Sequence, residues 1–304
     1  MKRLSLSILG TTAVLLALYA TLLRLTGLQA DFAETNFEAN LSQIYNYLQG
    51  EHQTAVLVGS SLSARILPQY FAEAGLGVGN LGLDGSKVAT GIALLRMRSD
   101  LPGLVMLEAN SLLAPQTLND REILNSMRGP SFWLGKRLFF LRPQARPSAL
   151  LYSWFKRRRD VRLSGEGAAF AVDLTQRTSL TTGATNAVPI DAAHSEFEKG
   201  LKEQIRFLQG HGVRVAIVRL PAGKDDLTAP PFATTPAGIF AAAMGIPSID
   251  LRDEFARRHE KVYYTDTLHM TGPSARSAAT ILAEWLRQNH LVPAQAKAAR
   301  IQPK

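Results

Sequence analysis

Short apolar segments alternate with longer amphipathic ones along most of the chain, and this alternation restricts the fold more than any other feature. Strands buried on both faces of a parallel sheet have continuous apolar sequences, and helices connect them. We therefore predict a three-layer α/β/α domain with a mostly parallel five-stranded sheet of the flavodoxin-like type, whose ligand site lies at the carboxyl ends of the strands. The predicted strands are residues 55–58, 77–81, 104–107, 214–218 and 248–251, and the predicted helices are residues 64–74, 88–99, 195–209, 236–244 and 272–288.

The amino-terminal segment predicts a membrane anchor at residues 1–30. Lys2 and Arg3 precede an uncharged, mainly apolar stretch that ends at Arg24, and its length suits a helix that crosses a bilayer. The positive charges favour a cytoplasmic amino terminus, so we expect a single-pass protein of the inner (cytoplasmic) membrane whose remaining chain is periplasmic or otherwise extracytoplasmic. A cleaved secretory signal is the alternative, although its apolar part is usually only about 7–15 residues long. Both interpretations export the domain.

The composition is that of a folded protein without disulfide bonds. With 304 residues, of which 46% are apolar, the chain can bury a substantial core. We expect a connector at residues 31–53, one principal domain at residues 54–290 and a flexible basic tail at residues 291–304. The formal charge of +9 favours an anionic partner such as a membrane surface or an acidic glycan, and the expected export argues against nucleic acid. The absence of cysteine excludes disulfide bonds and Cys-based metal sites.

A long insertion at about residues 113–194 interrupts the alternation and is far longer than an ordinary loop, so we predict a lid or cap there. Its middle part interleaves aromatic residues with basic ones and contains a single acid, Asp160. A solvated basic face on an apolar helix would explain this pattern, and so would docking onto anionic headgroups or an acidic polymer. The basic residues are Lys136, Arg137, Arg142, Arg146, Lys156, Arg157, Arg158, Arg159 and Arg162.

A serine follows the first predicted strand directly. The sequence Gly59-Ser60-Ser61-Leu62-Ser63 leads from that strand into a helix. Amides at the start of a helix can stabilise developing negative charge, so Ser61 is a candidate nucleophile. A serine at such a boundary can also be only a helix cap.

A candidate general base lies near the other end of the chain. Asp266 precedes His269 by three residues, and Gly272 and Pro273 mark the helix that follows. An Asp at this spacing can orient the imidazole and stabilise its cation while the His accepts the serine proton. Of the six histidines, only His269 combines a predicted strand-end loop with a nearby carboxylate. The same residues could also form an Asp-capped turn beside a surface histidine.

In their joint order, four short blocks resemble the SGNH (GDSL-like) serine hydrolase family. Residues 59–63 are similar to its GDSLS block, and residues 266–269 to its DxxH block. The resemblance implies catalytic roles for Ser61, Asp266 and His269. Residues 80–85 and 108–111 are similar to the second and GxND blocks, which implies oxyanion donors at Gly85 and Asn110. Two departures are Ser60, where the family has Asp, and Ala109-Asn110-Ser111 in place of the usual GxND context.

These departures resemble the divergent branch that modifies envelope polymers, which includes proteins of alginate and related exopolysaccharide O-acetylation. The resemblance implies an exported O-acyltransferase or O-acetylesterase that acts on a cell-envelope or secreted polysaccharide without a cofactor. It also implies an integral membrane O-acyltransferase as a partner. A lipid esterase or lysophospholipase is an alternative. Another is a catalytically silent glycan-binding assembly subunit with the same fold.

Two further motifs receive weaker interpretations. Gly77, Gly79 and Gly82 form a literal GxGxxG, but they lie within the second strand and its following loop, so we do not predict a nucleotide site. Arg219 follows the fourth strand, where it could bind an anionic substrate or form a structural salt bridge. We predict no metal site.

Overall fold

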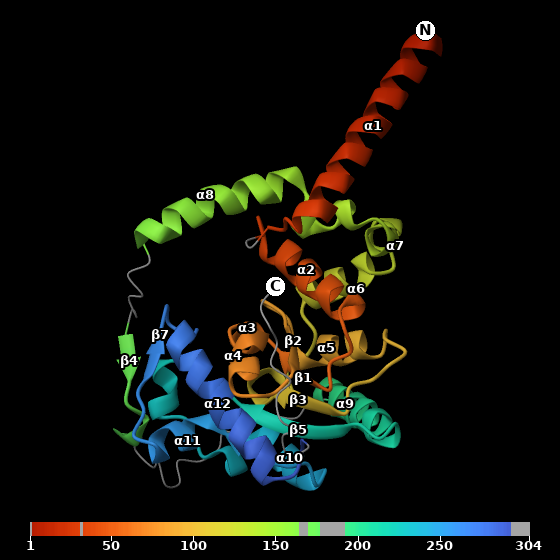
Figure 1. Ribbon diagram of the computed structural model, residues 1–304. Coiled ribbons are helices and arrows are strands. Elements are labelled where there is room, and N and C mark those ends of the chain that lie inside the picture. Colours follow the sequence, from red (N-terminus) through yellow and green to blue (C-terminus); the bar gives the residue numbers. More distant parts are fainter. Residues whose placement is uncertain (1, 31–32, 164–169, 177–191, 293–304) are drawn as a thin grey trace. The chain divides into compact units, whose positions relative to one another are not determined.

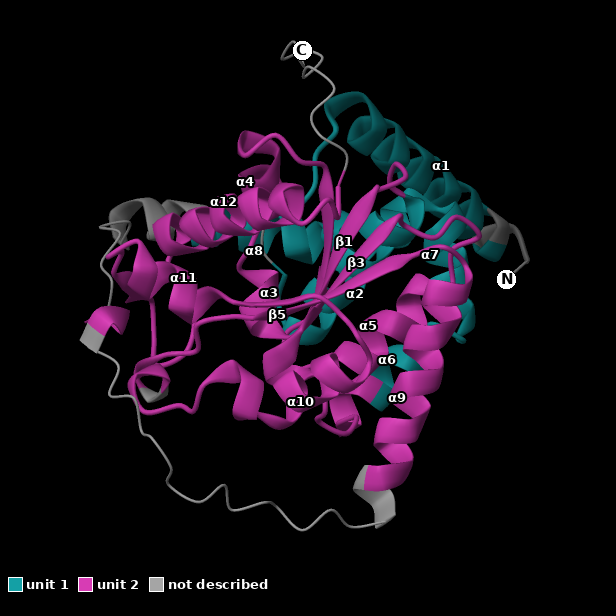
Figure 2. Ribbon diagram, turned by 90° about the horizontal axis from the view of Figure 1, so that it is seen from below, with its two compact units in different colours: residues 1–49, 121–165 teal, residues 50–120, 166–304 magenta. Residues whose placement is uncertain are grey.

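The structure is a computed structural model that describes residues 2–30, 33–163, 170–176 and 192–292. The chain divides into two compact units (Figure 2). Unit 1 consists of residues 1–49 and 121–165, and unit 2 of residues 50–120 and 166–304. Most of the predicted connector, residues 31–49, and the middle of the predicted insertion, residues 121–165, thus belong to unit 1, while the beginning and the end of the insertion belong to unit 2.

A five-stranded, entirely parallel sheet forms the centre of unit 2 (Figure 1). Its strand order is β2-β1-β3-β5-β6, which confirms the predicted parallel sheet of five strands. A separate antiparallel pair, β4 with β7, was not predicted, because strands of three residues are too short to show a periodic pattern. The sheet strands are β1 (Ala55–Gly59), β2 (Val78–Gly82), β3 (Leu104–Glu108), β5 (Arg214–Arg219) and β6 (Ser248–Asp250), and the pair is β4 (Phe170–Val172) and β7 (Val262–Tyr264).

Helices cover both faces of this sheet, so unit 2 has the predicted three layers (Figure 2). One buried core lies between the sheet and α12, where Leu57 and Met106 belong to the same cluster as Leu282. Helices α5 (Val88–Leu95), α9 (Ala192–Gly210) and α10 (Pro236–Ala243) cover one face; α4 (Pro68–Glu73), α11 (Leu251–Arg257) and α12 (Gly272–Gln288) cover the other. Short 3-10 turns occupy Ala109–Ser111 (η1), Leu174–Gln176 (η4), Lys224–Leu227 (η5) and Phe232–Thr234 (η6).

One predicted helix is wrong. Residues 64–74 form no single helix; the chain instead makes α3 (Ser61–Ala64) and α4. The break lies at Leu67, which is extended because the ring of Pro68 disfavours a helical conformation in the preceding residue. Pro68 then begins α4, where its missing N–H costs nothing. The nucleophile turn therefore ends in a helix of only four residues.

Unit 1 consists of helices and 3-10 turns in its described residues. Its interior is formed where Tyr45 stacks on Phe132 at 4.6 Å between ring centroids and donates a hydrogen bond of 3.1 Å to the Phe132 carbonyl. A side chain at position 135 would collide with the Tyr45 ring, which explains Gly135. The elements are α1 (Lys2–Thr26), α2 (Asn36–Gln49), α7 (Pro130–Arg137), η2 (Phe139–Leu141), η3 (Pro143–Ala145) and α8 (Pro147–Leu163), and α6 (Leu118–Ser126) begins in unit 2 and continues into unit 1.

Helix α1 is long and apolar enough from Ser7 to Thr26 to cross a membrane. Most of its large apolar side chains are exposed, so it is not a buried core helix of unit 1. Parts of several predictions lie outside the described structure: the tail from residue 293, residues 177–191 of the insertion, and the side chains of Arg157, Arg158, Arg159 and Arg162. The lid role of the insertion stays a prediction.

Candidate active site

The nucleophile candidate lies at the carboxyl end of β1, an inner strand between β2 and β3. Ser60 is the cap of α3, and its hydroxyl accepts a 3.4 Å hydrogen bond from the Leu62 N–H. Ser61 is the first residue of that helix and is partly exposed. The two functions proposed for such a serine therefore fall on different residues: Ser60 caps the helix, and Ser61 remains available for chemistry.

A buried carboxylate holds this turn in place. Glu108 ends the neighbouring strand β3 and is fully buried. Its Oε1 accepts from the Ser60 hydroxyl at 2.6 Å, and its Oε2 accepts from the backbone N–H groups of Ser60 and Ser63 at 2.8 and 3.1 Å. The Ser63 hydroxyl adds a fourth bond of 2.6 Å. Four donors satisfy the carboxylate and fix the residues on both sides of Ser61.

Two glycines make room for this arrangement. A Cβ on Gly59 would collide with the Glu108 carboxylate and the Ser63 hydroxyl. A Cβ on Gly82, the last residue of β2, would collide with the backbone at Ala64. The close approach of three strand ends to the nucleophile turn therefore requires glycine at both positions.

Asp266 and His269 lie on a loop that the backbone closes tightly. The Thr265 N–H donates to the His269 carbonyl at 2.8 Å, and Tyr264 forms a bridge with Met270, so the loop leaves β7 and returns beside it. Asp266 Oδ1 accepts from the backbone N–H groups of Leu268 and His269 at 2.9 and 2.8 Å. The carboxylate thereby shapes the loop that carries its own histidine.

The structure brings the three predicted catalytic residues together in one relay. His269 Nε2 lies 2.9 Å from Ser61 Oγ, and His269 Nδ1 lies 2.8 Å from Asp266 Oδ2. A carboxylate only accepts hydrogen bonds, so Nδ1 carries the proton and Nε2 is left to accept from the Ser61 hydroxyl. This is the tautomer that a general base requires.

The carboxylate of the relay is ionised under ordinary conditions. Partial desolvation acts to raise the pKa of Asp266, but the hydrogen bonds from the backbone and ring of His269 and from Leu268 outweigh it and lower the pKa to about 2. A depressed carboxylate pKa contributes stability that is fully present above the unfolded value of about 4 and is lost as the pH falls toward 2. Asp266 can therefore stabilise an imidazolium at His269 throughout the neutral range.

The two predicted oxyanion donors lie at the same edge of the sheet. Gly85 follows β2 and has a φ of +68°, and Asn110 follows β3. Within the part of the chain that the structure describes, the N–H groups of Gly85 and Ser61 have no hydrogen-bond partner. The Asn110 amide donates to the Leu220 carbonyl at 3.0 Å and accepts from its N–H at 2.9 Å, which leaves one amide hydrogen for a ligand. Their role as an oxyanion hole stays a prediction.

Asp120, which the sequence did not indicate, holds the loop that contains Gly85. It is fully buried and accepts hydrogen bonds from the Ser86 hydroxyl, the Lys87 N–H and the Thr90 hydroxyl. Burial acts to raise the pKa of Asp120, but these bonds and those from Thr117 outweigh it and lower the pKa. No local motif marks Asp120, because its partners in the Gly85 loop lie at least 30 residues away in the sequence.

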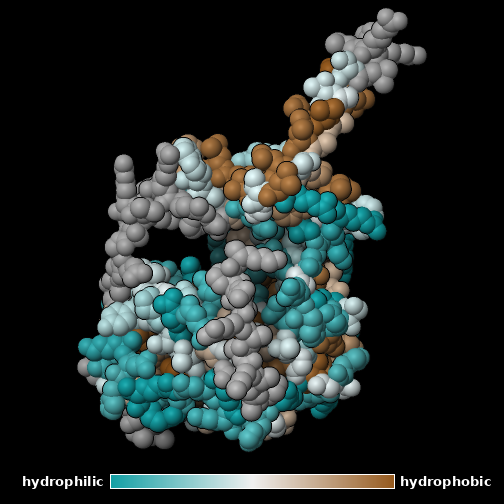
Figure 3. Space-filling view, in the orientation of Figure 1, coloured by the Kyte–Doolittle hydropathy of each residue, from teal (hydrophilic) through white to brown (hydrophobic). Residues whose placement is uncertain are grey.

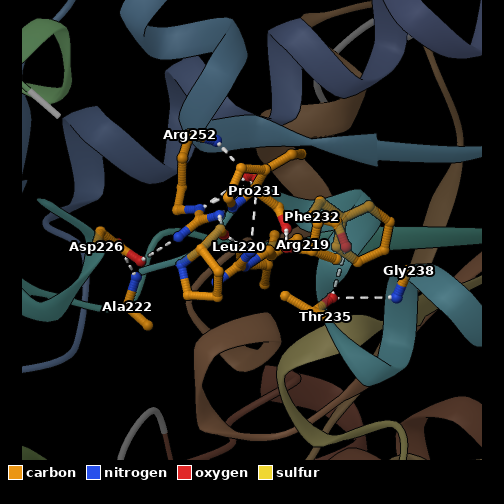
Figure 4. Close-up of polar contacts among 12 residues, drawn as sticks. Arg219, Leu220, Ala222, Asp226, Pro231, Phe232, Thr235, Gly238 and Arg252 are labelled. Atoms are coloured by element: carbon orange, nitrogen blue, oxygen red, sulfur yellow. Dashed lines mark hydrogen bonds and ion pairs between the residues drawn. The ribbon is translucent and has the colours of Figure 1, made fainter. Parts of the chain in front are cut away.

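A buried network of charges holds the loop after β5 (Figure 4). The fully buried Arg252 forms a 2.6 Å ion pair with Asp250 and lies 3.5 Å from Asp226. Arg219 lies 3.7 Å from Asp250 and donates to the Pro230 carbonyl at 2.9 Å, so it has the structural role that was one of its two predicted uses. Burial raises the pKa of Asp226, and the two arginines oppose this shift. Buried charges need either an opposite charge or a full set of hydrogen-bond donors, and in this network the ion pairs meet most of that need.

This loop supports the loop of Asp266 and His269. Asp226 accepts from the Ala222 N–H at 2.5 Å and from the Tyr264 hydroxyl at 3.3 Å, and Tyr264 directly precedes the catalytic loop. Gly223, at a φ of +96°, lies so close to the Thr267 carbonyl that a Cβ would collide with it. Leu220 of the same loop holds Asn110. One buried network therefore supports both the base and a predicted oxyanion donor.

The chain matches no protein-family model and no curated protein. The resemblance drawn from its four sequence blocks accordingly stays a prediction. What the structure adds independently is the relay geometry and the buried groups that hold it.

Replacing the buried carboxylate should destabilise the protein. In Glu108→Gln, the charge-assisted hydrogen bonds become weaker neutral ones and the NH₂ group can donate only to the Ser60 hydroxyl, so we expect the free energy of unfolding to fall by about 1–2 kcal/mol. The matched control is Glu73→Gln, because Glu73 forms an exposed ion pair with Arg276, and such pairs contribute only about 0–1 kcal/mol. Urea unfolding compares the variants, and equal losses would show that Glu108 is not the organising group of the turn.

A methyl group at position 223 should displace the catalytic loop. We expect Gly223→Ala to slow the labelling of Ser61 by a fluorophosphonate at least about tenfold, since small misplacements of catalytic groups have effects of this size or larger. The control is Gly212→Ala, which has a similar φ of +76° but open space around it. It carries backbone strain of about 1–2 kcal/mol without touching the loop. Similar labelling rates in both variants would contradict the supporting role of Gly223.

Proposed function

We propose that this protein is a membrane-tethered, extracytoplasmic serine esterase or acyltransferase of the SGNH type. The observation that supports it most directly is the relay from Ser61 to His269 to Asp266, with distances of 2.9 and 2.8 Å, at the carboxyl edge of a parallel sheet. A helix cap and a surface histidine do not need this alignment. A nucleophile with its base and orienting acid does.

The proposed reaction proceeds through an acyl-enzyme. Ser61 Oγ attacks the carbonyl carbon of an ester while His269 Nε2 accepts the hydroxyl proton. The tetrahedral intermediate collapses, the C–O bond to the alcohol breaks, and His269 returns the proton to the leaving oxygen. Water or a sugar hydroxyl then attacks the acyl-enzyme, again giving its proton to Nε2, and Ser61 leaves with that proton. Asp266 keeps the imidazole oriented and stabilises its cation in both halves of the reaction.

The oxyanion of each intermediate needs donors that are already in place. We assign this role to the N–H groups of Ser61 and Gly85 and to the remaining amide hydrogen of Asn110. Preorganised donors of this kind contribute about 2.7–4 kcal/mol each to transition-state stabilisation. The buried carboxylates of Glu108 and Asp120 serve the reaction indirectly, because they fix the loops that carry these N–H groups.

The proposal of a polysaccharide substrate rests on the sequence resemblance to the branch that modifies envelope polymers, and not on the geometry of the site. We propose that the acyl group is an acetyl ester of a cell-envelope or secreted polysaccharide, and that an integral membrane O-acyltransferase is the partner on the donor side. Helix α1 supports the envelope location, because it has the length and composition to anchor the chain in the inner membrane. The basic residues near its amino terminus favour a cytoplasmic start and an extracytoplasmic site.

The acyl-enzyme can be trapped directly. The full chain in detergent, incubated with 4-nitrophenyl acetate and quenched in acid, should show an acetyl adduct on Ser61 by mass spectrometry of its peptides. Ser61→Ala should remove the adduct, and His269→Ala should reduce its rate of formation by about 10²–10⁴-fold, the usual contribution of a general base. Ser99→Ala, an exposed serine outside the site, is the matched control and should behave like the unmodified chain.

The second substrate then separates the alternatives. Acetyl transfer to an added glycan supports the acyltransferase, and release of acetate alone supports an esterase. A strong preference for long-chain esters would favour the lipid esterase. No adduct and no turnover with any ester, together with glycan binding that Ser61→Ala leaves unchanged, would overturn the enzymatic proposal in favour of an assembly subunit.

The charge of Asp266 should matter more for catalysis than for folding. In Asp266→Asn, Oδ1 can still accept from the loop backbone, but the amide NH₂ cannot accept from His269 Nδ1, so the ring is held in the wrong tautomer. We expect kcat for ester hydrolysis to fall by about 10⁴-fold, with only a modest fall in the unfolding midpoint at neutral pH because the backbone hydrogen bonds to Oδ1 remain. Asp100→Asn is the control, since that carboxylate is similarly exposed (45% against 51%) and lies in a surface ion pair. Equal activity in the two variants would contradict the relay.

A further inference from the structure

Helix α8 exposes its large apolar side chains and buries small ones, which is unusual for a helix in contact with water. Small residues, Ala149 and Ser153, lie on its buried face. Leu151, Trp154 and Phe155 lie on the opposite face, as the 3.6-residue period requires, and are 55%, 48% and 57% exposed. Trp154 and Phe155 contact each other edge to face at 4.9 Å. A soluble helix has the reverse arrangement, so this face is suited to an apolar neighbour.

The same character continues onto the neighbouring part of unit 1. Trp133 and Leu134 of α7 and Leu141 of η2 are exposed as well. Figure 3 shows hydrophobic surface on α1 and around its base. We call Trp133, Leu134, Leu141, Leu151, Trp154 and Phe155 the apolar face of unit 1.

Helix α1 contacts the rest of unit 1 before it is long enough to have crossed a membrane. The Tyr19 hydroxyl donates to the Ala145 carbonyl at 2.5 Å, and the Leu23 side chain is almost fully buried. The apolar part of α1 that precedes Tyr19 is about 15 residues, or about 22 Å at 1.5 Å per residue. The hydrocarbon core of a bilayer is about 30 Å thick. The carboxyl-terminal part of the membrane-spanning segment must therefore include Tyr19 and Leu23, where α1 contacts the rest of unit 1. The part of unit 1 around this contact then lies at the membrane boundary.

The charges beside the apolar face suit the same boundary. The Arg137 guanidinium lies over the Trp133 ring at 3.9 Å, and Lys136 is exposed beside it in the sequence. Tryptophan and basic side chains concentrate at the level of lipid headgroups, where a ring can be apolar on one side and hydrated on the other. A purely solvated basic face would not require the exposed Leu, Trp and Phe side chains.

We propose that the apolar face of unit 1 docks into the headgroup boundary of the same bilayer that α1 crosses. This rests on one part of the proposed function, that α1 is a membrane anchor, and is independent of the catalytic part. Unit 1 is then bound at the membrane surface and is not a solvated linker. Helices that lie in this way bury their apolar side chains about 5–10 Å into the boundary region.

Tryptophan fluorescence can test this because the chain has three tryptophans in different places. Trp133 and Trp154 belong to the apolar face, whereas Trp285 packs against the core of unit 2. The full chain is reconstituted in bilayers of phosphatidylcholine and phosphatidylglycerol, with or without bromine at the 6,7 positions of the acyl chains. In Trp285→Phe we expect brominated lipid to reduce the emission at least about twofold, since its tryptophans then lie at bromine depth. In Trp133→Phe/Trp154→Phe we expect almost no reduction.

Two further variants test which side chains hold the face in the membrane. Adding Leu151→Ser and Phe155→Ser to Trp285→Phe should abolish most of the quenching, whereas adding Ile239→Ser, an equally exposed residue of unit 2 (59%), should not. Absence of quenching in Trp285→Phe, or equal quenching of Trp285, would overturn the proposal and favour a protein partner or solvent at this face. Alkaline carbonate extraction checks the anchor separately, and Ser61 labelling checks the enzymatic proposal, so each failure is distinguishable.

Discussion

The carboxylate of Glu108 is the constraint on which the arrangement of the site depends. It ends an otherwise apolar strand, is wholly removed from water, and forms no ion pair with any residue that the structure describes; four donors of Ser60 and Ser63 satisfy it instead. A buried carboxylate left without such partners would cost several kcal/mol, so the turn and the carboxylate stabilise each other. Ser61 lies between the two serines that are held, so the backbone on both sides of it is fixed.

The same device recurs at two other loops on this edge of the sheet. Asp120 holds the Gly85 loop, and Asp226, paired with Arg252, holds the loop that supports Asn110 and the catalytic histidine. Loops that carry a site need fixed geometry, yet they have few apolar contacts of their own to provide it. Buried acceptors supply that geometry through backbone N–H groups, which stay in place whatever the neighbouring side chains are. Each carboxylate thus positions a different part of one reaction site.

The sequence was sufficient for the sheet and the relay but not for what holds them. The five apolar strands and the DxxH spacing are local sequence patterns. Such patterns predict the structure of their own segments when a large hydrophobic core buries those segments. The groups that position the relay are long-range: Glu108 acts on residues at least 45 positions earlier, and Arg252 pairs with Asp226 across a loop. Of these groups, only Glu108 is marked by a local sequence feature, because it is a charged residue at the end of a fully apolar strand. The break between α3 and α4 could also have been predicted from the sequence. Pro68 disfavours a helical conformation at Leu67 even where the apolar spacing favours a continuous helix.

The exposure of the relay bears on whether water or a sugar receives the acyl group. The side chain of Asp266 is 51% exposed and that of His269 is 19% exposed, so the described residues do not seal the site from solvent. In the proposed reaction, exclusion of water by the described residues therefore does not account for transfer in competition with hydrolysis. A bound acceptor hydroxyl gains from proximity instead, since well-oriented groups react as if present at concentrations of about 10⁵ M or more, far above that of water. On this reasoning acceptor binding, more than the relay itself, decides the outcome of the proposed reaction, and the proposed docking of unit 1 would keep the chain near the proposed acyl donor in the same bilayer.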